Sequence, residues 1–236
     1  MGIEYRSGDV MILYKSKYYV PKYLNLFSYK KFGRNDVMVY QFANEMFFLK
    51  RCAGISGDTI DFRNNQFLVN GYNYMDNFFV TAHYCVKSED NIQFLQLLDS
   101  LKISYDSDEY ISCSKVHISL EEKNKILQYI HNGSLIPICG KENYYSVIPY
   151  RGYKITFNDS TYNLYKDVLI KYEIDSIRKE VDSYYVNGVK CNSYMFRNNY
   201  YYFIGDNMSN SLDSRALGFI PEYLIKGKCF CILGKK

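Results

Sequence analysis

The chain has 236 residues, a formal net charge of +4 and an isoelectric point near 8.5, and its basic residues are scattered among acidic ones. This length can bury a full hydrophobic core, and the charge pattern excludes the basic stripe of a nucleic-acid-binding protein. The 27 tyrosines and 15 phenylalanines favour strands, so we expect a mainly β protein.

Short apolar runs bounded by turn residues fill the first part of the chain. Runs of this kind are typical of strands. They predict strands over residues 10–14, 18–27, 36–42, 46–50, 59–62 and 66–69, and Asn70-Gly71 closes the last of them. We therefore expect a coiled, mostly antiparallel β domain.

A different pattern begins near residue 74. Apolar residues recur at helical spacing over 91–101, and Ser119-x-x-Glu122 is a capping box that predicts a second helix to residue 130. With strands over 78–86, 110–118 and 135–139, the order indicates a ferredoxin-like β-α-β-β-α-β lobe. We expect residues 74–139 to form this inserted α+β lobe, a lid or spacer without chemistry, between the core segments 1–73 and 140–236.

Strand signals return after this segment. Asn158 or Ser160 can cap a helix that ends near residue 172. The run from Tyr184 to Gly188 repeats the Val-Asn-Gly hairpin signal of residues 67–71. Further strands are expected over residues 200–204 and 224–233.

No pattern predicts a metal or a cofactor. The seven cysteines include no Cys-x-x-Cys pair and the three histidines do not cluster, so we expect neither group. The odd number of cysteines leaves at least one unpaired. No apolar run approaches the ~20 residues that cross a bilayer.

One lysine stands at the end of an apolar run. Residues 46–49 lead to Lys50, and the turn Gly54-x-x-Gly57-Asp58 follows. At the end of a buried strand an ammonium group is poorly solvated, which favours the neutral amine that a general base needs. Taken alone, a lysine in this place is more often one whose stem is packed and whose charge lies in water.

A second motif extends from Gly205 to Pro221 and reads Gly-Asp-Asn-Met-Ser-Asn-Ser-Leu-Asp-Ser-Arg-Ala-Leu-Gly-Phe-Ile-Pro. Together with Lys50-Arg51-x-x-Gly54-x-x-Gly57-Asp58, it resembles two sequence boxes of the type I signal peptidases. These are membrane-bound serine proteases with a Ser/Lys dyad. The two boxes stand in the family's order, and the resemblance implies a coiled antiparallel catalytic core of the signal-peptidase type.

The chain departs from the family pattern at three places. Ser56 stands where the family usually has proline, and Met208-Ser209 where it usually has Arg-Asp. Aligned on Gly8-Asp9, the family's nucleophile box places its serine just before Met1. The resemblance therefore implies a catalytic domain that lacks the anchor and the nucleophile, and is inactive in this form.

The resemblance also assigns roles to individual residues. Lys50 is the general base, and Ser211 supplies a hydroxyl that aims its amine, so we expect the two side chains within about 3 Å of each other. Met1, Phe48 and Leu49 match positions that line the pocket for a small substrate side chain; Phe48 and Leu49 have a core role as the alternative. The residues matched to structural support are Arg51, Asp206, Asp213 and Arg215.

The implied activity is removal of amino-terminal signal peptides from exported preproteins after a small-x-small sequence. The resemblance places this work at the outer face of the cell membrane, with the membrane surface as a partner of the full-length form. A non-catalytic homologue that binds signal peptides or partners is the alternative. The self-cleaving repressors also use a Ser/Lys dyad, but no helix-turn-helix precedes the β domain here.

Overall fold

The computed structural model describes residues 10–15, 32–43, 46–63, 66–74, 82–86, 91–103, 105–106, 114–118, 120–129, 135–137, 144–181, 183–208 and 211–233. Within them strands far outnumber helices and form antiparallel sheets, so the predicted mainly β class is confirmed. The chain divides into two compact units. Unit 1 holds the described residues between Asp61 and Tyr145 and those from Gly205 to Ser211, and unit 2 holds the others.

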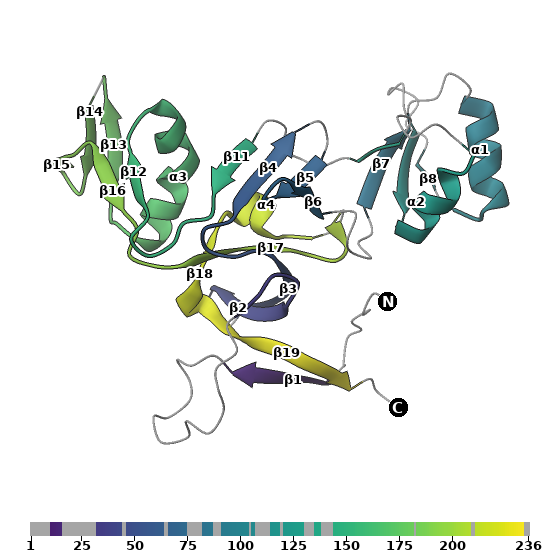
Figure 1. Cartoon of the computed structure of the whole chain (residues 1–236), viewed down its shortest axis with the longest axis horizontal. Coiled ribbons are helices and arrows are strands. Elements are labelled where there is room, and N and C mark those ends of the chain that lie inside the picture. The colour runs from purple at the N-terminus through teal and green to yellow at the C-terminus, as the bar shows by residue number, and fades with distance from the viewer. Residues whose placement is uncertain are drawn as a thin grey trace. The chain divides into compact units, whose positions relative to one another are not determined.

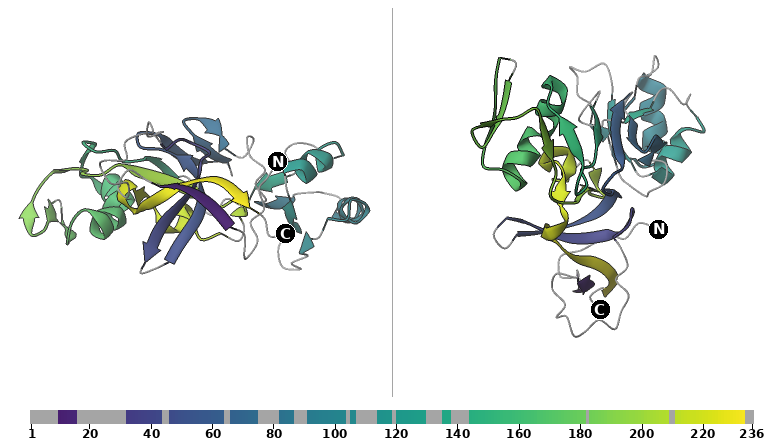
Figure 2. Two further views of the ribbon diagram at one scale, coloured as in Figure 1. Left: turned by 90° about the horizontal axis from the view of Figure 1, so that it is seen from below. Right: turned by 60° about the vertical axis from the view of Figure 1, so that its left-hand side comes forward.

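The largest sheet belongs to unit 2 and has six antiparallel strands in the order β1-β19-β2-β3-β17-β18 (Figure 1). The predicted strands over 10–14, 36–42, 46–50, 200–204 and 224–233 are all found in it, and the strand predicted over 18–27 lies outside the described residues. Figure 2 shows β1 running beside β19. The bounds are β1 Val10–Lys15, β19 Ile225–Leu233, β2 Val37–Ala43, β3 Met46–Gly54, β17 Tyr200–Ile204 and β18 Ile220–Pro221.

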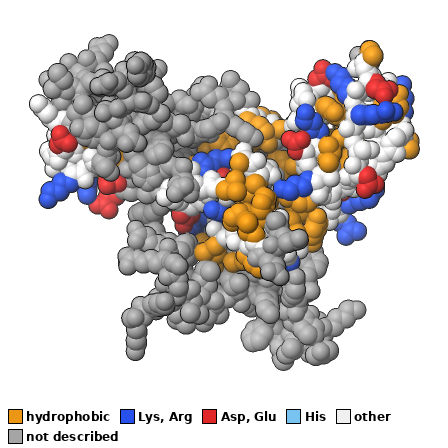
Figure 3. All heavy atoms as spheres, turned by 180° about the vertical axis from the view of Figure 1, so that it is seen from behind, with side chains coloured by type: hydrophobic (Ala, Val, Ile, Leu, Met, Phe, Trp, Pro, Cys, Tyr) orange, Lys and Arg blue, Asp and Glu red, His pale blue; other side chains and the backbone are white. Residues whose placement is uncertain are grey.

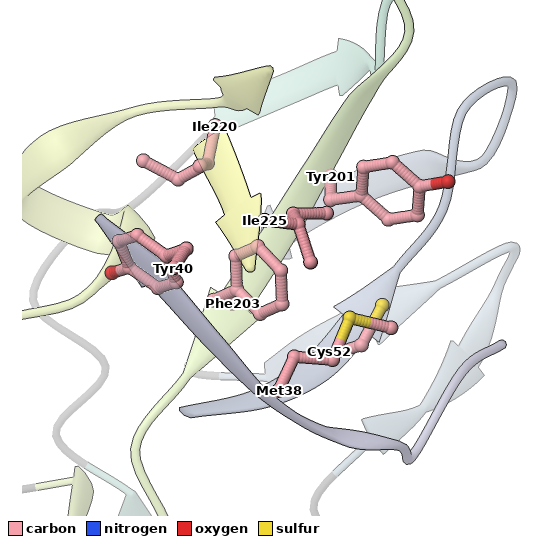
Figure 4. Close-up of a cluster of buried hydrophobic side chains, with 7 residues drawn as sticks. All are labelled: Met38, Tyr40, Cys52, Tyr201, Phe203, Ile220 and Ile225. Carbon is pink, nitrogen blue, oxygen red and sulfur yellow. The ribbon is translucent and has the colours of Figure 1, made fainter. Parts of the chain in front are cut away.

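A cluster of buried side chains packs on one face of this sheet (Figure 4). The rings of Tyr40 and Phe203 stack with centroids 4.9 Å apart. Alternate residues of a strand point to opposite faces, so Met38 and Tyr40 of β2 share one face with Cys52 and the partly buried Phe48 of β3. Its members are Met38, Tyr40, Cys52, Tyr201, Phe203, Ile220 and Ile225.

A second sheet has the order β11-β4-β5-β6. Asn70 and Gly71 both have positive φ, 53° and 81°, and connect β5 to β6 in the tight turn that their sequence predicts. The rings of Phe62 and Phe67 stack at 4.6 Å between β4 and β5. The bounds are β4 Thr59–Arg63, β5 Gln66–Val69, β6 Tyr72–Asn73 and β11 Tyr144–Val147.

The β-α-β-β-α-β order of the predicted lobe is found in unit 1, although the sequence predicts only three of its four strands and not the strand at Tyr105–Asp106. Its four strands form one antiparallel sheet in the order β10-β7-β9-β8. The boundaries of a separate lobe at residues 74 and 139 remain a prediction. The elements are β7 Ala82–Val86, α1 Asn91–Ser100, β8 Tyr105–Asp106, β9 Ser114–Ile118, α2 Leu120–Ile126 and β10 Leu135–Pro137.

Helix α2 is shorter than predicted. Leu127 N–H still donates to the carbonyl four residues back, but the N–H groups of Gln128 and Tyr129 donate to carbonyls three residues back. The last turn is therefore tightened and no longer α-helical.

The remaining elements of unit 2 surround helix α3, Asp159–Tyr172. Asn158, and not Ser160, caps this helix: its Oδ1 accepts from Thr161 N–H at 2.9 Å, while Thr161 Oγ1 accepts from Asn158 N–H at 3.0 Å. The predicted hairpin turn at Asn187-Gly188 joins β14 and β15. The strands are β12 Lys154–Thr156, β13 Ile177–Glu180, β14 Ser183–Val186, β15 Val189–Lys190 and β16 Ser193–Met195.

Apolar side chains also remain at the surface. Figure 3 shows a face on which hydrophobic side chains gather, with lysine and arginine side chains beside them. Exposed large apolar side chains include Met46, Phe47, Ile170 and Tyr223. Folded proteins keep much apolar area at their surface, so exposure alone assigns these residues no function. Among the described helices, none is both long enough and apolar enough to cross a membrane.

The core cluster gives a first testable prediction. Phe203 is fully buried, so Phe203→Ala should lower the free energy of unfolding by about 3–5 kcal/mol through lost burial and a residual cavity. Urea unfolding measures the change. Tyr129→Ala is the control, because Tyr129 is 66% exposed and its loss should cost less than about 0.5 kcal/mol. Equal stability of the two variants would show that the cluster is not the core.

Candidate active site

The register of β2 and β3 decides which way Lys50 points. Met38 lies opposite Lys50, and Tyr40 lies opposite Phe48. Directly opposed residues of antiparallel strands share a face, so Lys50 and Phe48 lie on the face that carries the buried Met38 and Tyr40. Lys50 is partly buried, and its Nζ lies 5.7 Å from the centroid of the Phe48 ring.

The residues predicted to contact substrate do not share one face. Leu49 follows Phe48 in the strand and therefore points to the opposite side of the sheet. Phe48 packs against the buried cluster, which also fits the alternative core role. Met1 lies outside the described residues, so the pocket formed by these three residues stays a prediction.

The turn after β3 is held by the carboxylate of Asp58. Asp58 Oδ2 accepts from Ile55 N–H at 2.8 Å, and Asp58 N–H donates to the Ile55 carbonyl at 3.0 Å. Gly57 has φ +91°, which disfavours any side chain, and a Cβ on Gly54 would lie 2.5 Å from Ile148 Cδ1. Gly57 is thus explained by the backbone conformation of the turn, and Gly54 by the close approach of the Ile148 side chain.

Arg34 completes this turn, and the sequence analysis missed it. Its guanidinium binds Asp58 through two hydrogen bonds, from Nε to Oδ2 at 2.6 Å and from Nη2 to Oδ1. Asp58 is 5% exposed, and a buried carboxylate needs such a partner. The hydrogen bond to Asp58 raises the pKa of Arg34. Arg34 precedes Asp58 by 24 residues, and no local motif links the two.

Ser56 has a structural role in this chain. Its Oγ donates to the Tyr200 carbonyl at 2.8 Å and accepts from Tyr200 N–H at 3.1 Å. The hydroxyl therefore bonds both backbone groups of the first residue of β17, whose N–H also donates to the Pro149 carbonyl at 3.0 Å. Proline, which the family usually has here, has no hydroxyl and could not make either bond.

Asp213 and Arg215 form an ion pair beside the short helix α4, Ser214–Leu217. Arg215 Nε and Nη2 donate to Asp213 Oδ1 and Oδ2, both at 2.8 Å, and Asp213 is 0% exposed. Ser214 Oγ accepts from Phe203 N–H at 2.9 Å, which ties this helix to β17. The role of this ion pair in supporting catalysis stays a prediction.

The other residues predicted for the site are divided between the two units. Arg51 Nη1 donates to the Asn35 carbonyl at 2.9 Å, and Arg51 pairs with β2 and β17. Asp206 and the partly buried Ser211 belong to unit 1, whereas Lys50 belongs to unit 2. The positions of the units relative to each other are not determined, so the separation of Lys50 and Ser211 remains a prediction.

A hydrogen-bond network around Glu173 was also missed by the sequence analysis. The hydroxyls of Tyr194 and Tyr200 donate to its carboxylate at 2.9 and 2.8 Å, and Asn198 Nδ2 donates at 3.1 Å. Burial, followed by the bond to Glu173, raises the pKa of Tyr200. The network anchors the start of β17 to the C-terminal end of α3.

The cysteine nearest the candidate site is unsuited to chemistry. Burial raises the pKa of Cys52, which is 0% exposed, so its thiol stays protonated and is a core group. Within the side chains that the structure describes, no three His, Cys, Asp or Glu residues gather as metal ligands.

Comparison with known proteins identifies the family. The motif of Lys50 with its Gly-x-x-Gly-Asp turn and the motif of the Asp213–Arg215 pair are the two that resemble sequence boxes of the signal peptidases. A model of that family, "Signal peptidase, peptidase S26", matches residues 1–126 and 146–233. The chain belongs to this family.

Two relatives carry the same designation. The chain is 25% identical over 202 residues to the signal peptidase I of Aquifex aeolicus (strain VF5), a match that covers 84% of this chain and 62% of that protein. It is 39% identical over 67 residues to the signal peptidase I of Buchnera aphidicola subsp. Schizaphis graminum (strain Sg), covering 28% and 20%. The chain thus spans less than two thirds of the length of either relative.

The role of Ser56 can be tested directly. Ser56→Ala should lower the free energy of unfolding by about 1–3 kcal/mol, because the carbonyl of Tyr200 loses a partly buried partner, while its N–H keeps the Pro149 carbonyl. Thermal or urea unfolding measures it. Ser100→Ala is the control, since the exposed Ser100 hydroxyl only donates to a carbonyl three residues back. A loss no greater than that of the control would contradict the assigned role.

Proposed function

We propose that this chain is the peptidase core of a signal peptidase I, which removes amino-terminal signal peptides from exported preproteins at the outer face of the cell membrane. Membership of the family supports the reaction class. The observation that supports the site most directly is the placement of Lys50 on the apolar face of β3, since an amine in such surroundings is more easily neutral.

The edge of β3 next to Lys50 supports a binding mode for the peptide. The pairing of β17 with β3 covers Arg51 to Gly54 only, whereas β2 pairs with β3 from Met46 to Arg51. Within the described residues, no strand is paired with the second edge of β3 over Met46–Leu49. An extended signal peptide can add there as a further strand, which brings its cleaved bond beside Lys50.

In the proposed reaction a serine just before Met1 is the nucleophile. Lys50 takes the proton of the serine hydroxyl as Oγ attacks the substrate carbonyl carbon. The tetrahedral intermediate then expels the amine of the mature protein, which receives that proton from Lys50. Lys50 next takes a proton from a water molecule as the water oxygen attacks the acyl carbon, and it returns this proton to the departing serine Oγ, which releases the acid and regenerates the serine and the neutral amine.

The other residues have supporting roles in the proposal. Ser211 orients the amine of Lys50 without adding charge that would favour the ammonium form. Asp206, Asp213, Arg215 and Arg51 hold the backbone of the two motifs. Phe48, with Met1, accepts the small side chain before the cleaved bond, whereas Leu49 points to the opposite side of the sheet and is left out of this pocket.

Cleavage is tested with the chain extended by a serine before Met1. This form should cleave a preprotein carrying Ala-x-Ala before the cleaved bond, and the chain that starts at Met1 should bind the peptide without cleaving it. Lys50→Ala should abolish cleavage, and Ser211→Ala should lower kcat/KM by about a hundredfold, as for loss of general-base assistance. Cleavage by the unextended chain would show that the nucleophile is wrongly assigned.

Matched controls separate chemistry from folding. Lys154→Ala and Ser100→Ala remove exposed groups of the same kinds and should leave kcat/KM unchanged. An extended protein that folds and binds the peptide yet never cleaves would favour the alternative, a non-catalytic homologue that binds signal peptides.

The rate should also depend on pH in a defined direction. Only the neutral amine of Lys50 accepts a proton, so kcat/KM of the extended chain should rise with pH as the ammonium form is lost. A pH–rate profile measures this. A profile that is flat, or that falls with rising pH, would remove Lys50 from the role of general base.

A further inference from the structure

A second lysine lies at the aromatic surface that carries Lys50. Lys171, in the last turn of α3, places its Nζ 4.9 Å from the centroid of the Phe42 ring and 5.1 Å from that of Tyr172. A cation over an aromatic face is attracted by the electron density of the ring. The contact therefore holds the end of α3 against β2.

Phe42 lies between Lys171 and Phe48 and contacts both of them. It lies at the irregular step of the β2–β3 pairing between Gln41 and Ala43, so its ring is not positioned by an opposed residue. The ring tilts against Phe48 with centroids 5.2 Å apart and an interplanar angle of 46°. The centroid of the Phe48 ring in turn lies 5.7 Å from Lys50 Nζ. Lys171 and Lys50 thus lie at opposite ends of one Phe42–Phe48 pair.

The ammonium group of Lys171 is partly buried against the rings of Phe42 and Tyr172. Although the side chain as a whole is exposed, partial burial of its ammonium group lowers the pKa of Lys171. In the part of the chain that the structure describes, Lys171 makes no ion pair. The two rings are therefore the groups that face its charge.

We propose that Lys171 is a positioning residue for substrate selection. Its ammonium group fixes the ring of Phe42, and Phe42 fixes the ring of Phe48. Phe48 then keeps the substrate pocket narrow enough that only a small side chain fits before the cleaved bond. This inference rests on the proposed function, in which Phe48 lines the pocket. Lys171 touches neither the peptide nor the reacting atoms.

The same helix offers a matched control. Lys166 Nζ lies 5.8 Å from the Tyr162 ring, a contact of the same kind that involves neither β2 nor β3. Lys166→Met and Lys171→Met remove the same charge from α3 and keep a straight apolar chain. Lys171→Arg keeps a cation over the ring and should behave like the original protein.

The test compares two substrates with the serine-extended chain, one with alanine and one with valine before the cleaved bond. Lys171→Met should lower the alanine-to-valine ratio of kcat/KM by about twofold to fivefold, the change that loss of one cation–ring contact allows. Most of this change in the ratio should come from a lower KM for the valine substrate, because the Phe48 ring can move and make room for valine while Lys50 is unchanged. Lys171→Arg and Lys166→Met should each give the same alanine-to-valine ratio as the original protein. An unaltered ratio in Lys171→Met, or an equal change in Lys166→Met, overturns the inference.

A measurement that needs no activity separates this inference from the proposed function. With ¹³C-labelled phenylalanine, Lys171→Met should shift the ring resonances of both Phe42 and Phe48, and Lys166→Met should shift neither. If the extended chain cleaves nothing, the proposed function fails. An unshifted Phe48 resonance in Lys171→Met would separately show that Lys171 does not position Phe48.

A double variant tests the role of Phe42. In a Phe42→Leu background the alanine-to-valine ratio of kcat/KM should no longer change on Lys171→Met, because the ring between Lys171 and Phe48 is gone.

Discussion

The register between β2 and β3 is the constraint on which the rest of the site depends. It places Lys50 opposite Met38 and Phe48 opposite Tyr40, so that a potentially charged side chain shares a face with the hydrophobic cluster. A slip of one residue would turn Lys50 to the other face and bring Leu49 into the cluster. Burial of Met38, Tyr40 and Phe203 holds the register, so the packing of the core and the chemistry of the lysine have the same origin.

Two buried aspartates hold the loops that carry the two motifs. Asp58 and Asp213 each accept a backbone N–H and bind a guanidinium group through both carboxylate oxygens, from Arg34 and Arg215 respectively. A carboxylate buried without these partners would be strongly destabilising. The two arginines are therefore part of the loops' structure, although one is close to its aspartate in sequence and the other is distant.

The strands and turns could be predicted because their signals are local. Asn187-Gly188 and Asn70-Gly71 form the turns that their backbone preferences require, and Tyr200–Ile204 is a strand with the predicted bounds. The C-terminal end of α2 could not be predicted, because the tightening of its last turn depends on hydrogen bonds that its sequence does not mark.

The contacts that support the site depend on the folded chain and left little trace in the sequence. Ser56 meets Tyr200 across 144 positions, and Arg34 meets Asp58 across 24. The Glu173 network likewise joins a helix end to a strand start. The family resemblance, and not the apolar run alone, assigns Lys50 the role of general base, and only the register shows which face it occupies.

The central claim is that Lys50 and Ser211, 161 positions apart, form one catalytic pair. The most direct measurement is the distance from Lys50 Nζ to Ser211 Oγ in a crystal structure of the serine-extended chain with a bound, uncleaved signal peptide. The account predicts a hydrogen bond of about 3 Å between them. A structure in which the two side chains lie on different faces of the folded protein, with the peptide bound elsewhere than along β3, would contradict it.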